Sequence, residues 1–348
     1  MARVLTIVLL LGLLGQTFAQ ETFSAADLRR DFEFIVQTIQ DVHPNPHIHI
    51  SEAELEQLQA QVENQLDEPL TAQAFYEVAG SYVNGLEDSH TFMLLESTLN
   101  ADSLEYRVDQ SRERRAYTQI NGVGVLDLPS FWLTPNEQDE ARELEEFSDF
   151  FEESFKRFSD KGVTRLVIDL RNNSGGNSSV GDALTAYITD EPYRMFASSE
   201  VKVSQQLIDW WERVGMETPE DFSERIGEKV VETFSLESPP PIPLRFEGEV
   251  FVLTSQGTAS SAMDFAAVVK DFQIGTIVGE ETGDLPTHVG DSIIFTLPTT
   301  GLELRVSHKY FVRPGDFDDG RGVLPDCEVE ASQALQAVLS GECQAISP

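Results

Sequence analysis

A short run of small residues with two serines, Gly-Thr-Ala-Ser-Ser at 257–261, separates an apolar segment (249–253) from a helix-like one (264–270). Strand, tight turn and helix in this order expose a serine hydroxyl beside the outward-facing N–H groups of a helix N-terminus. We therefore expect Ser260 to be a catalytic nucleophile. The same residue types are also common helix caps, so this segment alone leaves both interpretations open.

His90 is the best-placed candidate for the general base that a serine nucleophile requires. It lies in Asp-Ser-His-Thr at 88–91, where the third predicted helix leads into a strand. Segments at the ends of such elements often carry catalytic groups, and histidine changes its protonation state near neutral pH. A lone histidine at such a junction is also commonly a surface or capping residue, so the position is only a candidate.

Two adjacent glycines, Gly175 and Gly176, lie between a buried strand (164–170) and a predicted helix (179–188). A glycine pair there brings backbone amides close to a bound group, as in a phosphate cradle or an oxyanion hole. The Gly-Lys-Ser/Thr pattern of a phosphate-binding loop is missing. We therefore expect an oxyanion hole formed by the N–H of Ser261 and that of Gly175 or Gly176.

Three histidines in one loop, His43, His47 and His49, suggest a metal site at first sight. No carboxylate joins them at a familiar ligand spacing, and the prolines at 44 and 46 are typical of a braced surface loop. The chain also lacks a Cys-x-x-Cys pair. We interpret them as surface histidines and expect neither a metal nor another cofactor.

The elements that position these residues follow from hydrophobic spacing. Apolar residues at helical spacing follow Ser24, Ser51 and Thr71, each a suitable N-cap, and predict a small helical domain over 20–92. Strands are expected at 122–129, 164–170, 249–253, 291–298 and 302–311, and an acidic helix with a phenylalanine stripe at 137–158. Residues 93–348 form the predicted core domain, in which 200–246 is an insertion or a cleft wall.

The charge of the chain argues against some classes of binding partner. The 348 residues carry a net charge of −36, spread along the whole chain. Such a surface repels phosphate backbones and anionic lipids, so we expect no nucleic-acid partner. Neither the oligomeric state nor the substrate preference is indicated by the composition.

Residues 1–19 are typical of a signal peptide, with Arg3, an apolar run over 4–14 and a cleavage site after Ala19. No later segment is apolar and long enough to predict a membrane span. We expect a secreted or periplasmic protein. In such a compartment the two cysteines, Cys327 and Cys343, are expected to form a disulfide bond.

Together the motifs resemble those of the C-terminal processing (tail-specific) serine peptidases, on the side of the tricorn-core and interphotoreceptor retinoid-binding protein relatives. Five segments carry this resemblance in the family's order: 88–91, 169–176, 257–262, 279–283 and 322–326. The resemblance covers nearly the whole chain after the signal peptide. It implies an α/β fold whose catalytic core is a repeated ββα unit of the crotonase/Clp kind, here preceded by the small helical domain.

The resemblance also implies roles for particular residues. The family's Ser–Lys dyad is missing, because Leu285 stands where the lysine is expected. The tricorn-like branch instead uses serine, histidine, a second serine and an acid. By position these are Ser260, His90, Ser89 and Asp319, with Asp318 as a rival for the acid. The segment after 91 is too short for the family's PDZ domain.

The sequence therefore predicts an exported serine peptidase that hydrolyses peptide bonds in peptides or unfolded proteins. Ser260 is the predicted nucleophile and His90 the general base, oriented by Ser89 and Asp319. One alternative is a non-catalytic relative that binds a small apolar ligand, since a fold does not determine function. The other is an esterase or acyl hydrolase that uses the same site.

Overall fold

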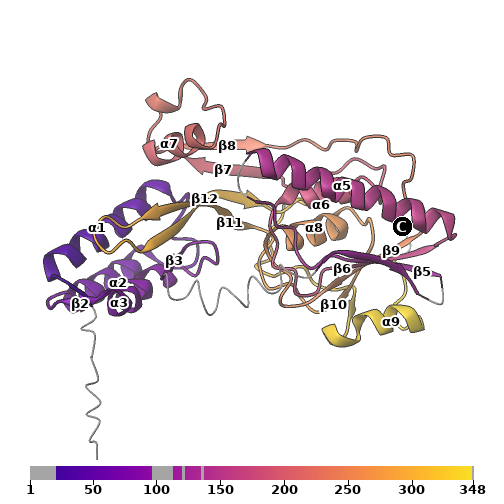
Figure 1. Cartoon of the computed structure of the whole chain (residues 1–348), viewed down its shortest axis with the longest axis horizontal. Helices are drawn as coiled ribbons and strands as arrows, with labels where there is room; N and C mark the ends of the chain where they lie inside the picture. The colour runs from indigo at the N-terminus through magenta and orange to yellow at the C-terminus, as the bar shows by residue number, and fades with distance from the viewer. Residues whose placement is uncertain (1–20, 96–112, 120–121, 135–136, 347–348) are drawn as a thin grey trace, which may run out of the picture.

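The computed structural model describes residues 21–95, 113–119, 122–134 and 137–346, without the side chains of 137 and 138. The predicted signal peptide at 1–19 lies outside these residues. Helices α1–α3 gather at one end of the molecule and a large sheet with flanking helices lies at the other (Figure 1). A long hairpin, β11 (His288–Thr296) and β12 (Glu303–Val312), connects the two ends.

The three N-terminal helices begin at the predicted caps. They are α1 (Ala25–Val42), α2 (Glu52–Gln65) and α3 (Ala72–Asn84). Their N-caps are Ser24, Ser51 and Thr71, and each cap side chain accepts a backbone N–H of the first turn. The short strands β1 (Thr22–Phe23) and β2 (Leu70–Thr71) pair antiparallel beside them. Local capping chemistry therefore sets where these helices begin.

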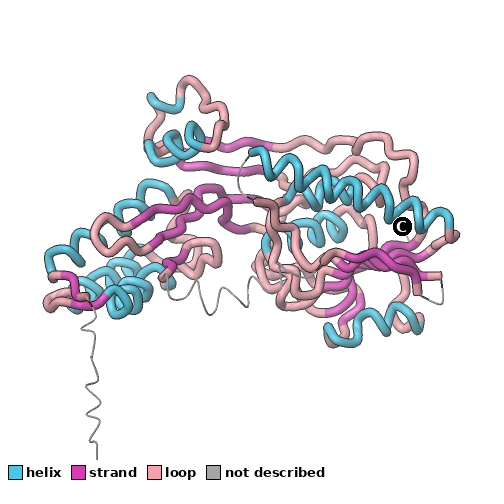
Figure 2. Tube along the Cα trace, in the orientation of Figure 1, coloured by secondary structure: helices cyan, strands magenta, loops and turns pink. Residues whose placement is uncertain are grey.

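A six-stranded sheet forms the centre of the other end, in the order β13-β10-β9-β6-β5-β4. Its strands are β4 (Arg115–Thr118), β5 (Val123–Asp127), β6 (Arg165–Asp169), β9 (Glu249–Thr254), β10 (Thr276–Gly279) and β13 (Cys327–Glu328). All neighbouring strands are parallel except the edge pair β4 and β5. Figure 2 shows these strands grouped, with helices on either side.

Helices cover both faces of this sheet. On one face pack α5 (Glu137–Asp160), α6 (Ser178–Thr185) and α8 (Ser260–Asp271), and on the other packs α9 (Ala334–Ser340) (Figure 1). Neighbouring residues of one strand alternate between the two cores: Val250 and Val252 face α8, whereas Phe251 and Leu253 face α9. This near-continuous apolar run is expected of a strand buried on both sides.

The second sheet joins the N-terminal helices to the rest. The strand β3 (Phe92–Leu94) pairs with β12, which also pairs with β7 (Ser198–Lys202), and β7 pairs with β8 (Lys229–Thr233). Helix α7 (Gln205–Arg213) and the 3-10 turn Phe222–Glu224 connect β7 to β8. One hydrophobic cluster runs from α1–α3 through this sheet to α7. The boundary predicted at residue 92 is thus crossed by a shared core, and the division into two domains stays a prediction.

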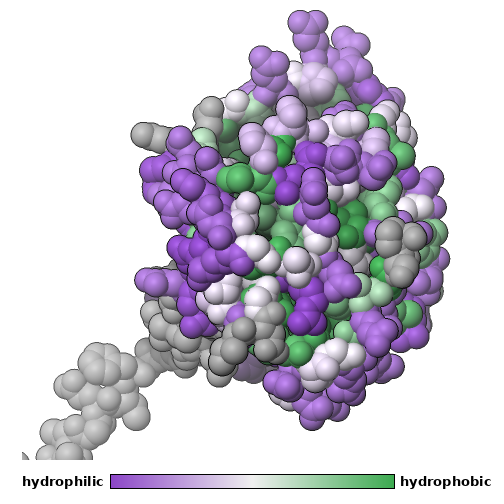
Figure 3. Space-filling model, turned by 90° about the vertical axis from the view of Figure 1, so that its right-hand side faces the viewer, coloured by the Kyte–Doolittle hydropathy of each residue, from purple (hydrophilic) through white to green (hydrophobic). Residues whose placement is uncertain are grey.

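Near the C-terminus, a second 3-10 turn (Ala331–Gln333) precedes α9, and Cys327 and Cys343 have their sulfurs at bonding distance. This pair connects the segment after α9 to β13, as expected. The α/β fold class is confirmed. None of the described helices is both long and apolar enough to cross a membrane. Figure 3 shows one end of the molecule, where hydrophilic side chains surround scattered apolar ones.

Candidate active site

Two loops meet at the carboxyl edge of the six-stranded sheet, because β6 and β9 are parallel neighbours. The loop after β6 carries Gly175 and Gly176, and the loop after β9 leads to Ser260. Loops beyond the carboxyl ends of parallel strands are where open α/β sheets bind ligands. Sheet topology thus brings together two motifs that lie more than 80 residues apart in the chain.

Ser260 is the first residue of α8 and has a positive φ of 48°. A non-glycine residue in this region is strained, and such strain is often found at functional positions. The N-cap of α8 is Ala259, and no side chain of the cap residue satisfies the helix terminus. The capping interpretation of Ser260 is therefore wrong: its Oγ faces His90.

The loop before Ser260 is held by buried hydrogen bonds to its neighbours. Thr258 Oγ1 donates to Leu170 O (2.8 Å), and Ala259 N donates to Asn173 O (3.0 Å). Asp284 Oδ2 accepts the N–H of Ser260 at 3.0 Å. Asp284 directly precedes Leu285, so the segment that supplies a lysine in dyad enzymes here supplies a carboxylate to the backbone of Ser260.

His90 reaches Ser260 from the other end of the molecule. Its Nε2 lies 3.2 Å from Ser260 Oγ, and its Nδ1 lies 3.1 Å from Ser89 Oγ. Both are hydrogen-bonding distances. Ser292 Oγ, on β11, donates to the carbonyl oxygen of His90 at 2.6 Å. The structure therefore brings Ser89, His90 and Ser260 together in one chain of contacts.

The two glycines lie against the start of α8. A Cβ at Gly175 would lie 2.7 Å from Ser260 Cβ and 3.0 Å from Ser261 N, and one at Gly176 would meet the backbone of Phe131. Both glycines have positive φ, 99° and 146°. The missing Cβ of Gly175 lets the loop after β6 lie directly against Ser261 N and the side chain of Ser260.

The two candidate oxyanion donors on this loop differ in their hydrogen bonds. The N–H of Gly175 donates to Asn173 Oδ1 at 2.9 Å. No hydrogen bond donated by the Gly176 N–H is found among the described residues. Asn173 is itself buried and donates from Nδ2 to Leu128 O. Of the two donors that the sequence left open, Gly176 is thus the one that remains available.

Asp88 and His43 were missed by sequence reasoning as parts of the site. Asp88 Oδ1 accepts the backbone N–H of His90 at 2.8 Å and lies 4.0 Å from its Nδ1. Asp88 Oδ2 lies 3.3 Å from His43 Nε2 and accepts from Ser307 Oγ at 2.7 Å. Burial alone would raise the pKa of Asp88, but hydrogen bonds from His43, Thr91 and Ser307 outweigh it and lower the pKa to about 2.

The prediction of a surface position is wrong for His43, whose side chain is only 2% exposed, whereas His47 and His49 are exposed as expected. His43 is the C-cap of α1, and the helix directs it inward against Asp88. The only signal in the sequence was the position of Asp88 two residues before His90. An aspartate commonly accepts a backbone N–H at that spacing.

Asp319 does not lie with the other predicted site residues. Its carboxylate is 43% exposed, lies 3.5 Å from Arg313 and accepts the backbone N–H of Arg321. Among the described residues, no hydrogen bond or ion pair connects it to Ser89 or His90. Its rival Asp318 accepts the N–H of Gly320 in the same exposed turn. The exposed turn is held by local hydrogen bonds and by Arg313, and the role of Asp319 or Asp318 as an orienting acid stays a prediction.

A second buried polar group borders His90. The ring of His288 stacks on the ring of His90 with centroids 5.8 Å apart, and His288 Nδ1 lies 3.8 Å from Asp264 Oδ1. Burial lowers the pKa of His288 to about 4, with a further contribution from His90. Burial and the charges of Asp284 and Asp291 raise the pKa of Asp264 well above its ordinary value. His288 is therefore neutral at pH values well above 4, and Asp264 keeps its proton at pH values where an ordinary aspartate has lost it.

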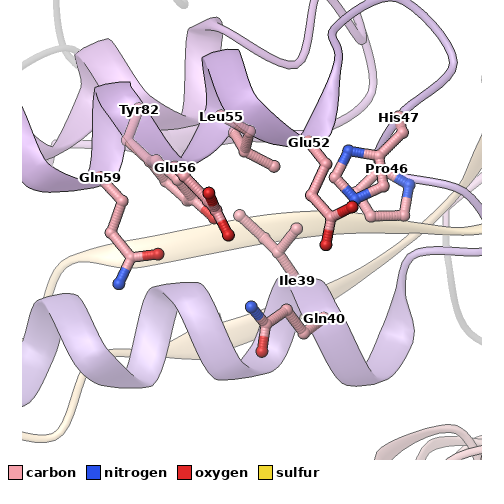
Figure 4. Close-up of a pocket in the computed structure, with 9 residues that line it drawn as sticks. All are labelled: Ile39, Gln40, Pro46, His47, Glu52, Leu55, Glu56, Gln59 and Tyr82. Carbon is pink, nitrogen blue, oxygen red and sulfur yellow. The ribbon is translucent and has the colours of Figure 1, made fainter.

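A small pocket lies elsewhere, between α1 and α2 (Figure 4). Its volume is about 130 Å³, and its lining includes Glu52, Glu56 and Gln59 beside Ile39 and Leu55. Neither Ser260 nor His90 lines this pocket, so the alternative of an apolar ligand bound beside Ser260 stays a prediction. No cluster of three or more candidate metal ligands is found in the part of the chain that the structure describes.

Two curated proteins resemble the chain in sequence. A tail-specific protease from Haemophilus influenzae is 21% identical over 179 residues, which are 51% of this chain and 20% of that protein. A chloroplastic C-terminal processing peptidase from Tetradesmus obliquus is 25% identical over 198 residues, 56% of this chain and 35% of that protein. The chain thus matches only a fifth to about a third of the length of these relatives.

Solved structures resemble the fold over most of the chain. A lipoprotein from Streptococcus agalactiae has a TM-score of 0.57 at 16% identity, covering 90% of this chain and 96% of that one. Mature CPAF has a TM-score of 0.57 at 14% identity, covering 91% and 95%. The sequence model of peptidase family S41 matches residues 122–329, which include both loops at the carboxyl edge of the sheet. The chain therefore belongs to peptidase family S41, a family of serine peptidases.

Proposed function

We propose that this chain is a serine peptidase that hydrolyses peptide bonds with Ser260 as the nucleophile and His90 as the general base. The observation that carries the proposal is the 3.2 Å distance between His90 Nε2 and Ser260 Oγ, two residues 170 positions apart. A base within hydrogen-bonding reach of the hydroxyl can take its proton as the oxygen attacks. Ser89 Oγ, 3.1 Å from Nδ1, orients the ring.

In the first step, Ser260 Oγ bonds to the carbonyl carbon of the peptide, and its proton moves to His90 Nε2. The negative charge that develops on the carbonyl oxygen is stabilised by the N–H groups of Ser261 and Gly176. His90 then returns the proton to the nitrogen of the leaving amine as the C–N bond breaks. Water, activated by His90 in the same way, releases the acid product and restores Ser260.

The proposal also includes a peptide substrate and export of the protein from the cytoplasm. The S41 family membership favours peptides or unfolded proteins over other acyl compounds. Export is supported by the apolar run after Arg3 and by the disulfide-distance pair Cys327 and Cys343. N-terminal sequencing of the protein from its host checks the export proposal. A chain that starts after Ala19 supports export, and a chain that keeps residues 1–19 contradicts it.

The test of the activity combines a denatured protein substrate with a fluorophosphonate probe. Wild type is expected to cleave the substrate and to carry the probe on Ser260, whereas Ser260→Ala does neither. Ser81→Ala, an exposed serine on α3, is the matched control and should behave as wild type. Equal cleavage by wild type and Ser260→Ala would exclude this nucleophile. Probe labelling together with cleavage of esters but not of peptides would favour the acyl hydrolase.

A further inference from the structure

The catalytic histidine of the proposed mechanism needs a negative charge near Nδ1. When His90 takes the proton of Ser260, the imidazolium is stabilised by a nearby carboxylate, which also favours the tautomer with hydrogen on Nδ1. Ser89 Oγ is a neutral partner and cannot supply that charge. Asp319, the residue expected to supply it, contacts Arg313 and the Arg321 backbone instead.

We infer that Asp88 is the acidic positioning residue of His90, and that His43, at the end of α1, holds the Asp88 carboxylate in place. This inference rests on the proposed function of His90 as the base. The two carboxylate oxygens of Asp88 have different partners. Oδ1 accepts the His90 N–H and lies 4.0 Å from Nδ1, while Oδ2 faces His43 and Ser307.

The orientation of the His43 ring follows from its second nitrogen. His43 Nδ1 accepts the backbone N–H of Asn45 at 3.1 Å, so in the neutral ring the hydrogen resides on Nε2. That hydrogen points to Asp88 Oδ2, at 3.3 Å. Both side chains are nearly fully buried, 2% and 3% exposed. A buried carboxylate with such partners keeps its charge and its position.

Other groups with a charge or a titratable proton also face His90. On β11, His288 stacks against its ring, and the charge of Asp291 interacts with it, although Asp291 is paired with Lys309 at 2.8 Å. Asp264 lies behind His288 and is raised in pKa by burial. Among the described residues, Asp88 is thus the carboxylate that accepts the backbone N–H of His90 and also lies within 4.0 Å of its ring nitrogen Nδ1.

The contacts of Asp88 connect the N-terminal helices to the proposed catalytic base. His43 ends α1, Asp88 follows α3, and Ser307 lies on β12, so three separate elements meet at one carboxylate. Helices that would otherwise only cover the second sheet then hold the base at the distance that Ser260 requires. Because preorganised groups need no rearrangement during the reaction, this arrangement favours turnover rather than substrate binding.

The test compares four variants of the full chain. Asp88→Asn keeps the shape of the side chain but removes its charge, and kcat should fall by roughly 10²-fold or more with little change in KM, because His90 is then less well held as the base. His43→Leu removes the donor to Asp88 and should lower kcat, whereas His43→Gln restores an N–H donor and most of the rate. A loss of kcat in Asp319→Asn but not in Asp88→Asn overturns the inference. Equal rates for His43→Leu and His43→Gln overturn the role of His43.

A measurement without catalysis separates this inference from the proposed function. Nitrogen-15 NMR of the histidine side chains reports the tautomer of His90, with His90→Gln used for assignment. Wild type should carry the hydrogen on Nδ1, and Asp88→Asn should reduce this preference. Unchanged signals overturn the inference even in an active enzyme. If wild type cleaves nothing, the proposed function fails, and the NMR result still decides whether Asp88 positions His90.

Discussion

The Cα hydrogen of Gly175 faces the side chain of Ser260 so closely that a Cβ there would lie 2.7 Å from Ser260 Cβ. It would also lie 2.9 Å from Ala259 O, and the backbone of Gly175 has φ of 99°. Two independent restrictions, one steric and one conformational, therefore require glycine at this position.

Replacing Gly175 with alanine should separate the loop after β6 from Ser260. We expect Gly175→Ala to lower kcat/KM by about 10²-fold or more, because the oxyanion donors are displaced. The unfolding free energy should fall by roughly 1–3 kcal/mol from backbone strain. Activity assays and urea denaturation measure the two effects. Gly162→Ala is the matched control, since Gly162 also has positive φ (63°) but open space at its Cβ. It should lose stability and keep its activity.

The buried histidines predict a loss of stability in acid. Burial lowers the pKa values of His288 and His308 from 6.5 to about 4, so unfolding below pH 6.5 lets both rings take up protons. Their contribution to the free energy of unfolding is complete above pH 6.5 and is lost as the pH falls towards 4. The loss amounts to at most about 3 kcal/mol for each ring. Denaturation between pH 4 and 7 measures it. His308→Gln should flatten the slope, whereas His47→Gln, at an exposed ring, should leave it unchanged.

The buried Asp264 predicts the opposite dependence. Its pKa is raised well above 3.8 by burial and by Asp284 and Asp291, so the folded state holds a proton that the unfolded chain releases. Stability linked to this group is complete below pH 3.8 and decreases as the pH rises towards the raised pKa. Asp264→Asn should therefore be more stable than wild type at pH 8 by about 1–3 kcal/mol. Urea midpoints at pH 4 and 8 test this. An equal gain in the exposed control Asp190→Asn would refute the burial argument.

The Cys327–Cys343 pair should stabilise the C-terminal segment. A disulfide that closes a loop of 16 residues is expected to contribute about 3 kcal/mol, mainly by restricting the unfolded chain. Replacing both cysteines with alanine should lower the unfolding free energy by that amount. Treatment of wild type with a reductant should reproduce the loss and have no effect on the double variant. A stability of wild type that is insensitive to reductant would show that the bond does not form.

Much of the local structure was predictable from the sequence. Ser24, Ser51 and Thr71 cap the helices that they were expected to cap, because an N-cap bond joins residues only two or three positions apart. The apolar run at 249–253 and the turn after it became β9 and the start of α8. Such signals reach over a few residues, and a single segment contains them.

The relative positions of the segments were decided by the tertiary structure. Nothing near His43 in the sequence indicates that its ring is buried against Asp88, since the contact depends on how α1 packs beside α3 and β12. The exposed carboxylate of Asp319 is likewise paired with Arg313, which the motif does not include. The order of the motifs predicted that Ser260 and His90 belong to one site. The distance between them is set by the packing of α1–α3 against the β11–β12 hairpin and by the pairing of β9 with β6. Contacts between distant segments depend on the whole core, which no local pattern encodes.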